Sequence, residues 1–354
     1  MHVLLELSNN RHEALDLAVK ATSTAFCAME LANPAVLREA CKLYGRALAA
    51  HSSCLTKERS NPNIHNIGLI CTSVVLSLYE AMDGTSSAGF ISHITGSTIL
   101  MELALLEGHS QCLLQEVLYY VRFHQTFLSL LGRSDTPHSS NPLSYIGLSD
   151  KVPTVQRLLN LASVLLTFYP SAPMPQIPDA VILSQISKAI DDLWLEYTTT
   201  SARLSSNTIT WTDSSGVHYR DAMTALILMY FSAVHVLHAL ASSSSEHELD
   251  AYSTADVIDY HARILNAAAF LYQKRIGCAY NRMSLPLYLV AVHGPLAVQR
   301  MHARNYFEHW RLGGTMAGIS KLALERMEEV ETTQPLFDNR GLEMKLPARL
   351  GVAG

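Results

Sequence analysis

The stretch IGLICTSVVLSLYEAMDG, from Ile67 to Gly84, indicates most directly how this chain folds. Its apolar residues recur every three or four positions, which is the period of one face of an α-helix. The closing Asp–Gly pair is typical of a helix end. The stretch therefore predicts an amphipathic helix over 67–82, with its apolar stripe in a core. The stripe consists of Ile67, Ile70, Cys71, Val74, Val75, Leu78 and Met82.

The same helical period recurs along most of the chain, and strand-like alternation is nearly absent. Asn33–Pro34 supplies a cap and a first-turn proline, which opens another helix. The pattern predicts an all-α fold, a large single-domain antiparallel array of about 12–16 helices. Further helices are predicted over 90–102, 113–131, 152–168, 179–197, 220–241, 253–276, 284–300 and 303–330.

Breaks in this pattern divide the chain into two helical halves, over residues 1–132 and 145–331. A segment rich in proline and serine separates them at 133–144, and an irregular tail follows at 332–354. The segment Ala222–Ala241 is uncharged and long enough to cross a bilayer. Because it carries His235 and His238 and has no flanking basic cluster, it is predicted to be a buried core helix and not a membrane anchor.

The composition argues against direct contact with DNA. The chain has 354 residues, of which 49% are hydrophobic and 16% charged, and its formal net charge is −5. Its basic residues form no run longer than a pair, whereas a surface that binds phosphates needs a basic stripe. Six cysteines are present, and no two lie within ten residues of each other, so no zinc-binding spacing occurs.

No set of residues predicts a catalytic, cofactor or metal site. The sixteen histidines lack an HExxH pattern and convergent acidic company, so core or partly exposed roles are predicted for them. The segment DDLWLE, from Asp191 to Glu196, resembles the aspartate-rich motif of class I terpene synthases. The second metal motif of those enzymes has no counterpart here, so DDLWLE is interpreted as a solvated acidic helix face.

The segment FISHITGSTILME, from Phe90 to Glu102, places a histidine and a glycine inside an apolar helix. His93 and Gly96 lie three residues apart and so share one face. A glycine within a helix costs about 1 kcal/mol relative to alanine. We therefore expect a neighbouring helix to cross closely at Gly96, with His93 hydrogen-bonded beside the crossing.

In its order of segments the chain resembles the regulatory domain of fungal binuclear zinc cluster (Zn2Cys6) transcription factors. In that family a helix of the form A…YgrAL precedes an apolar helix ending in YE, and an HxxGa…L helix follows. The C-terminal segments RIGCAYNRMSLPLYL and YFEHWRLGGTMAGISKLALERMEEV are similar to the family more loosely. The matching residues of the first half are Ala40, Tyr44, Ala47 and Leu48, then Tyr79 and Glu80, then His93, Gly96 and Leu100.

The resemblance implies a regulatory module located in the nucleus, or in the cytoplasm as the alternative. The family's closely spaced cysteine cluster, which reads DNA, has no counterpart in this sequence. The chain is therefore expected to regulate transcription through a protein partner at genes of a fungal secondary-metabolite cluster. The expected partner is a zinc-cluster factor, a co-regulator or a second copy of the chain, and a small-molecule effector is also compatible with the family. Tyr44, Tyr79, Glu80, His93 and Gly96 form the structural signature of this resemblance.

The alternative function is that of an enzyme or a small-molecule-binding protein of the same pathway, built on the same helical scaffold. Its polar groups would line an apolar pocket between helices. The candidate pocket residues are His235, His238, His261 and His293, together with Tyr219 and Tyr230 as acid–base groups. Because no acid–base–nucleophile set is visible in the sequence, the regulatory function is the one predicted.

Overall fold

A computed structural model describes residues 12–58, 67–83, 87–106, 112–133, 152–169, 179–204, 208–214, 216–243, 253–274, 277–313 and 316–333. These ranges contain twelve α-helices and one two-stranded sheet, so the predicted all-α class is confirmed. The helices are α2 (Glu13–Glu30), α3 (Pro34–Glu58), α4 (Ile67–Asp83), α5 (Ser87–Leu106), α6 (Cys112–Leu130), α7 (Thr154–Leu166), α8 (Ala180–Leu204), α9 (Ala222–Ser243), α10 (Thr254–Lys274), α11 (Gly277–His293), α12 (Ala297–Gly313) and α13 (Ala317–Thr333). The strands are β1 (Thr210–Asp213) and β2 (Gly216–Tyr219).

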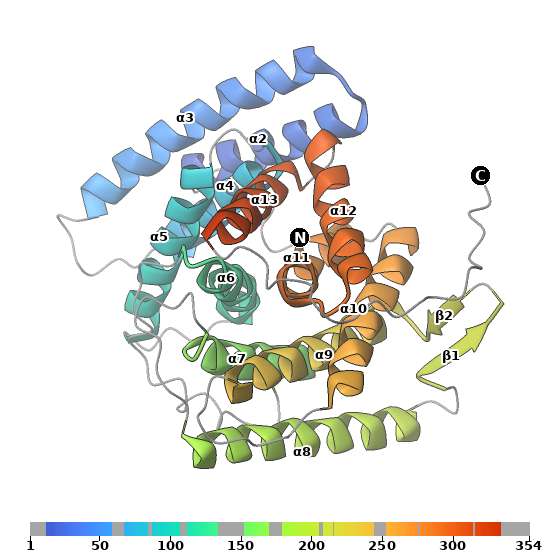
Figure 1. The fold of residues 1–354 in the computed structure, drawn as a ribbon. Coiled ribbons are helices and arrows are strands. Elements are labelled where there is room, and N and C mark those ends of the chain that lie inside the picture. The colour runs from blue at the N-terminus through green and yellow to red at the C-terminus, as the bar shows by residue number, and fades with distance from the viewer. Residues whose placement is uncertain are drawn as a thin grey trace.

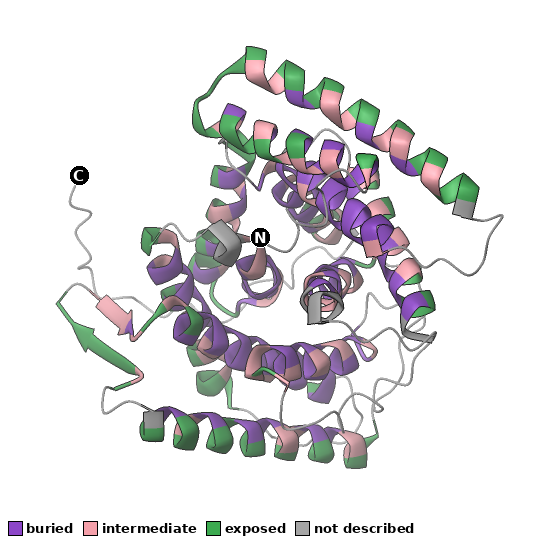
Figure 2. Ribbon diagram, turned by 180° about the vertical axis from the view of Figure 1, so that it is seen from behind, coloured by how far each residue is buried: buried purple, intermediate pink, exposed green. Residues whose placement is uncertain are grey.

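The longest helices, α3 and α8, lie on opposite sides of the molecule, and α6 and α11 run between them (Figure 1). Helix α2 packs against both α3 and α4, while α9 packs against α7, α8 and α10. The outward faces of α3 and α8 are exposed, whereas the inner helices are buried along most of their length (Figure 2). The helices are therefore arranged as an array around a shared interior, and not as a stack of repeats.

One large hydrophobic core joins the two halves of the chain. It contains Phe90 and Phe127 from the first half and Tyr230 and Tyr288 from the second, all nearly inaccessible to solvent. A smaller core lies under α2, α3 and α4 and includes Leu15. Because aromatic side chains bury large apolar areas, the shared cluster is a major source of cohesion between the halves.

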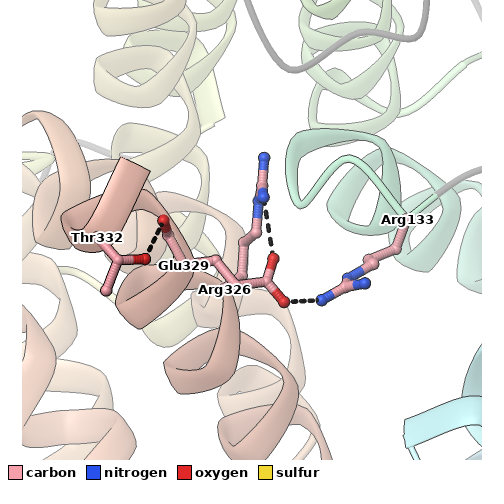
Figure 3. Close-up of polar contacts among 4 residues, drawn as sticks. All are labelled: Arg133, Arg326, Glu329 and Thr332. Atoms are coloured by element: carbon pink, nitrogen blue, oxygen red, sulfur yellow. Dashed lines mark hydrogen bonds and ion pairs between the residues drawn. The ribbon is translucent and has the colours of Figure 1, made fainter. Parts of the chain in front are cut away.

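Helix α13 connects the end of the chain to its first half. It packs against α4 and α5, and its Glu329 accepts hydrogen bonds from Arg133, just after α6, and from Arg326 (Figure 3). The distance from Arg326 Nη1 to Glu329 Oε2 is 3.0 Å. The hydroxyl of Thr332 donates to the carbonyl of Glu329, which adds a local contact near the helix end. Apart from Arg133 and residues 332–333, the predicted proline- and serine-rich break at 133–144 and the predicted tail at 332–354 lie outside the described residues.

Several predicted boundaries are confirmed by local chemistry. Helix α3 begins at Pro34, as expected, because the Asn33 side chain accepts hydrogen bonds from the backbone N–H groups of Ala35 and Val36 at 3.0 and 3.3 Å. Helix α4 covers the predicted stripe from Ile67. Gly84, predicted to end it, lies outside the described residues. Local capping and periodicity therefore fix these elements.

The C-terminal helices differ from the prediction. Two helices were expected over 284–300 and 303–330, but the chain forms three, α11, α12 and α13. The break between α11 and α12 falls at Gly294–Pro295, and Pro286 lies inside α11. A proline within a helix leaves the carbonyl four residues earlier without its N–H donor. Here the Tyr230 hydroxyl donates to that carbonyl, of Arg282, at 2.8 Å, which lets the helix continue through Pro286.

The small antiparallel sheet was not predicted, because it falls in the polar segment 198–216 between the helices predicted over 179–197 and 220–241. Within that segment, α8 continues to Leu204, β1 spans Thr210–Asp213 and β2 begins at Gly216. Gly216 has a φ of 125°, a conformation that suits glycine at the turn. Trp211 stacks on His218 across the pair at 5.5 Å between ring centroids. Alternation of β-branched and aromatic residues around Trp211 was the available signal.

Candidate functional site

Four of the five signature residues meet where α3, α4 and α5 come together. Tyr44 lies on α3, Tyr79 and Glu80 on α4, and His93 on α5. The Tyr44 hydroxyl donates a hydrogen bond to the Glu80 carboxylate and lies 3.2 Å from His93 Nε2. Since the phenol hydrogen points to Glu80, His93 donates from Nε2 to the phenol oxygen. We call this chain of hydrogen bonds the Tyr44–Glu80–His93 cluster.

Aromatic contacts hold the cluster in place. The rings of Tyr44 and Tyr79 stack at 4.1 Å between centroids with only 9° between their planes. The Tyr79 hydroxyl donates to Cys41 Sγ at 3.3 Å, so Tyr79 also joins α4 to α3. Tyr79 and Glu80 are both nearly fully buried. A buried carboxylate needs hydrogen-bond partners because its desolvation is costly, and Tyr44 supplies one.

Two glycines that the sequence did not single out allow backbones to approach Glu80. A Cβ added at Gly89 would lie 2.5 Å from Glu80 Oε1. A Cβ added at Gly318, near the start of α13, would lie 2.1 Å from the Glu80 carbonyl oxygen. At Gly318 the obstructing atoms belong to the backbone, so glycine is required there, whereas at Gly89 they are the end of the Glu80 side chain, which an added methyl group would displace. The available signal for Gly318 was the Gly–Ile step of the C-terminal segment that resembles the zinc-cluster family.

The predicted close crossing at Gly96 is wrong. A Cβ added there would meet nothing within 4 Å, and the residue is partly exposed. The close approaches occur at Gly89, seven residues earlier on the same helix, and at Gly318. A single glycine within a helical pattern indicates that a Cβ is absent but does not reveal which face meets a neighbour. That information comes from the packing of α13 on α4 and α5.

His93 is uncharged at neutral pH. Burial and, as a smaller cause, charge repulsion from the nearby His51 together lower its pKa to about 4. The His51 ring is itself buried and lies 3.0 Å from the Ser73 hydroxyl, and burial lowers its pKa too. Because the folded pKa of His93 lies far below neutrality, this imidazole is a poor general base in the pH 7 range. The cluster is chemically suited to fixing three helices together.

The four predicted pocket histidines lie in two separate pairs. His235 and His238 belong to α9, where His235 stacks on Tyr260 at 4.5 Å and His238 Nε2 lies 3.0 Å from the Leu183 carbonyl. Burial lowers the pKa of His235 to about 4, and the neighbouring His238 contributes. Both rings therefore have defined packing partners on α10 and α8.

The second pair consists of His261 on α10 and His293 at the end of α11. His261 Nδ1 lies 2.7 Å from the Val257 carbonyl, one helical turn earlier. His293 Nε2 is hydrogen-bonded to the Tyr169 hydroxyl, and the two rings meet edge to face at 5.4 Å. Burial and then His261 lower the pKa of His293 to about 4. Within the part of the chain that the structure describes, no three His, Cys, Asp or Glu residues form a group that could hold a metal ion.

The two candidate acid–base tyrosines are buried and strongly disfavour ionisation. Burial raises the pKa of Tyr219 to about 12, and Tyr219 packs on Phe270 at 5.2 Å. Burial raises the pKa of Tyr230 well above its ordinary value, and its hydroxyl is engaged with the Arg282 carbonyl. The contacts of these two tyrosines are thus with Phe270 and with the Arg282 carbonyl.

The acidic segment and the long apolar helix have the surroundings expected from their sequences. On α8, Asp191 and Asp192 are exposed, and Glu196 accepts two hydrogen bonds from Arg157 at 2.8 and 2.7 Å. Helix α9 is the one described helix long and apolar enough to cross a membrane, with a mean hydropathy of 1.7. However, 72% of that apolar window is buried inside the molecule, as in a core helix.

The chain was compared with known protein families, curated sequences and solved structures. No protein-family model, curated protein sequence or solved structure matches the chain.

Proposed function

We propose that this chain is a regulatory module of fungal-type transcription control that acts through a DNA-binding protein partner in the nucleus. Its targets are genes of a secondary-metabolite cluster. The observation that carries the proposal is the Tyr44–Glu80–His93 cluster. Tyr44, Glu80 and His93, three of the residues on which the resemblance to zinc-cluster factors rests, are far apart in the sequence, yet they join α3, α4 and α5 at one partly buried point.

The physical character of the cluster supports a structural role for these residues. Glu80 and Tyr79 are buried, the Tyr79 ring stacks on Tyr44, and glycines bring α5 and α13 against the same turn of α4. Such a closely packed arrangement explains why a family would keep these residue types without a reaction to perform. A helical module held together in this way is a suitable scaffold for binding a partner.

The charge distribution supports action through a partner. Several arginines form ion pairs with carboxylates on neighbouring turns or helices, which makes them less available to phosphates. Arg304, for example, reaches Glu331 at 2.6 Å, and Arg311 reaches Glu308 at 2.7 Å. Because phosphate contacts need cations that are not already paired, these arginines are poorly placed to bind DNA.

The first test is deletion of the gene, followed by transcript measurement across the neighbouring genes. We expect their transcripts to change together, and complementation with the intact gene to restore them. If the transcripts are unchanged while a biosynthetic intermediate accumulates, the regulatory proposal is wrong and the enzyme alternative gains support.

The second test asks whether the chain acts when it is brought to a promoter. Fusion to a heterologous DNA-binding domain is expected to change expression of a reporter gene that carries the matching operator. The fusion with Tyr44→Phe, which removes the phenol hydroxyl, is expected to lose much of this effect, whereas the matched Gly96→Ala fusion should retain it. A reporter that does not respond to the intact fusion would argue against the proposed function.

A further inference from the structure

Helix α12 carries a row of large apolar side chains that face solvent. The helix lies at the edge of the array, where it packs against α10, α11 and α13 (Figure 1). Its inward side chains, among them Ala303 and Phe307, are buried in the shared core. On its outward side Val298, Met301 and Leu312 are 55%, 59% and 82% exposed. Because these three side chains add little to the core, contact with a partner would remove much of their apolar surface from water.

The exposed row has the spacing of a surface that packs against another helix. Val298, Asn305 and Leu312 follow one another at intervals of seven residues, Met301 lies between the first two, and all four are exposed. Residues at i, i+3 and i+7 share one face of a helix, as in the contact face of a coiled coil. A single asparagine within such a row is known to fix the register of pairing. The row is about 21 Å long, since a helix rises about 1.5 Å per residue.

The row is complementary to itself when two copies of α12 run antiparallel. A two-fold axis at Asn305 places Val298 of one copy opposite Leu312 of the other, because both lie seven residues from the axis. The axis also brings the two Asn305 amides together, and each amide offers donors and an acceptor to the other. His302 of one copy then lies opposite Glu308 of the other, where an imidazole N–H group can donate to the carboxylate.

The charges along the row favour this antiparallel arrangement over a parallel one. In a parallel pair each Glu308 would face the Glu308 of the other copy, and like charges that face each other oppose association. The antiparallel pair separates these carboxylates and gives each a histidine. Two arginines flank the row, and both already pair with carboxylates of their own chain. Arg304 reaches Glu331 at 2.6 Å, and Arg311 reaches Glu308 at 2.7 Å.

We propose that the outward face of α12 is a self-association surface, through which two copies of this chain pair antiparallel about Asn305. A second copy is the occupant because apolar residue meets apolar residue, amide meets amide, and histidine meets carboxylate across the axis. A contact along one helix of 17 residues is small beside a standard interface, which buries about 800 Å² per partner. The dimer is therefore weak and forms as the concentration rises. This pairing does not rest on the proposed function.

Sedimentation equilibrium of the full chain at neutral pH measures the pairing. We expect a monomer–dimer equilibrium in the micromolar range. Leu312→Lys should weaken it at least tenfold, because a charge then lies against Val298 of the other copy. Leu195→Lys is the matched control, since Leu195 is 66% exposed on α8, and this variant should pair as the intact chain does.

Both replaced leucines are exposed, so both variants should keep the circular dichroism spectrum and melting temperature of the intact chain. A chain that stays monomeric at every concentration would overturn the proposal. Equal weakening by the two lysine variants would overturn it as well, because the contact would then not be specific to α12.

Substitution of the exposed His302 tests the antiparallel arrangement. His302→Glu should weaken the dimer severalfold, because two carboxylates then face each other across the axis. His302→Lys places a cation opposite Glu308 and should leave the dimer as strong or stronger. In a parallel pair both variants would bring like charges together, so equal weakening by both would show that the antiparallel arrangement is wrong. Because these readouts measure association alone, they are independent of the transcript and reporter experiments.

Discussion

At the residue scale, two glycines differ in whether an added Cβ atom can be accommodated. Gly318 faces the Glu80 carbonyl at a distance that excludes any Cβ, whereas Gly96 faces open space. Both glycines belong to segments that resemble the zinc-cluster family, so the sequence alone gives them similar weight. Their surroundings give them opposite consequences on substitution.

We expect Gly318→Ala to destabilise the protein by about 2 kcal/mol or more, because overpacking against backbone atoms forces α13 away from α4. Gly96→Ala should instead stabilise it by about 0.5–1 kcal/mol, since alanine is the better helix former and has room. Urea unfolding of both variants measures the two effects. Equal stabilities would show that α13 does not approach Glu80 as described.

The buried histidines predict a loss of stability in mild acid. His93, His235 and His293 have folded pKa values of about 4, and His124 of about 3, against an ordinary value of 6.5. The folded state therefore binds fewer protons than the unfolded state between pH 6.5 and about 4. Stability is at its full value above pH 6.5 and falls as the pH decreases through this window.

Each of these four histidines should contribute close to one proton taken up on unfolding at pH 5.5, or about 1.4 kcal/mol of unfolding free energy per pH unit. Unfolding by urea at several pH values from 5 to 7 gives the slope. His124→Phe should reduce the slope by about one proton. A stability that does not change over this range would contradict the neutral, buried state of these rings.

At the element scale, α11 depends on a partner from another helix. Pro286 deprives the Arg282 carbonyl of its intrahelical donor, and Tyr230 of α9 replaces that donor. Because the hydrogen bond from Tyr230 keeps α11 continuous, this helix extends into the centre of the molecule. Sequence reasoning could place a proline near a helix start, but it could not supply the tyrosine.

Tyr230→Phe should therefore cost about 1–3 kcal/mol, because it leaves a buried carbonyl without a donor. In the background of Pro286→Ala, which restores the N–H group, the same substitution should cost less than about 1 kcal/mol. Unfolding free energies of the two single variants and the double variant complete the cycle. An unchanged cost in the alanine background would argue against this account of α11.

Other elements could be predicted from the sequence. The stripe that begins at Ile67 predicts α4, and the Asn33 cap predicts the start of α3, because both signals are local. The β1–β2 pair was missed because short strands carry weak signals beside long helices. Of the candidate site, the sequence identified Tyr44 and His93 but misplaced the close contact at Gly96, since which helices cross is a nonlocal property.

At the scale of the whole molecule, the two halves share one hydrophobic core and are joined again by α13. The ion pairs of Glu329 lie near the surface, and such pairs contribute about 0–1 kcal/mol, so packing is the larger source of cohesion. The molecule should therefore unfold as a unit and not as two halves in turn.

This cooperativity can be observed from both halves separately. All three tryptophans, Trp194, Trp211 and Trp310, belong to the second half, so their fluorescence reports on that half alone. We expect the fluorescence transition in urea to coincide with the loss of hydrogen-exchange protection in α4, and Gly318→Ala to shift both by the same amount. Two separate midpoints would contradict a shared core.

The sequence by itself determined that the chain is helical, where most helices begin, and that it carries no recognisable catalytic or metal motif. These properties follow from local periodicity, capping and spacing. Only the tertiary structure decided that Tyr44, Glu80 and His93 meet, that Gly318 and not Gly96 is the tight contact, and that His124 is buried among the rings of Phe90, Tyr120 and Phe123. The physical reason is that burial and close contact between helices depend on residues distant in sequence, and local patterns do not specify which faces come together.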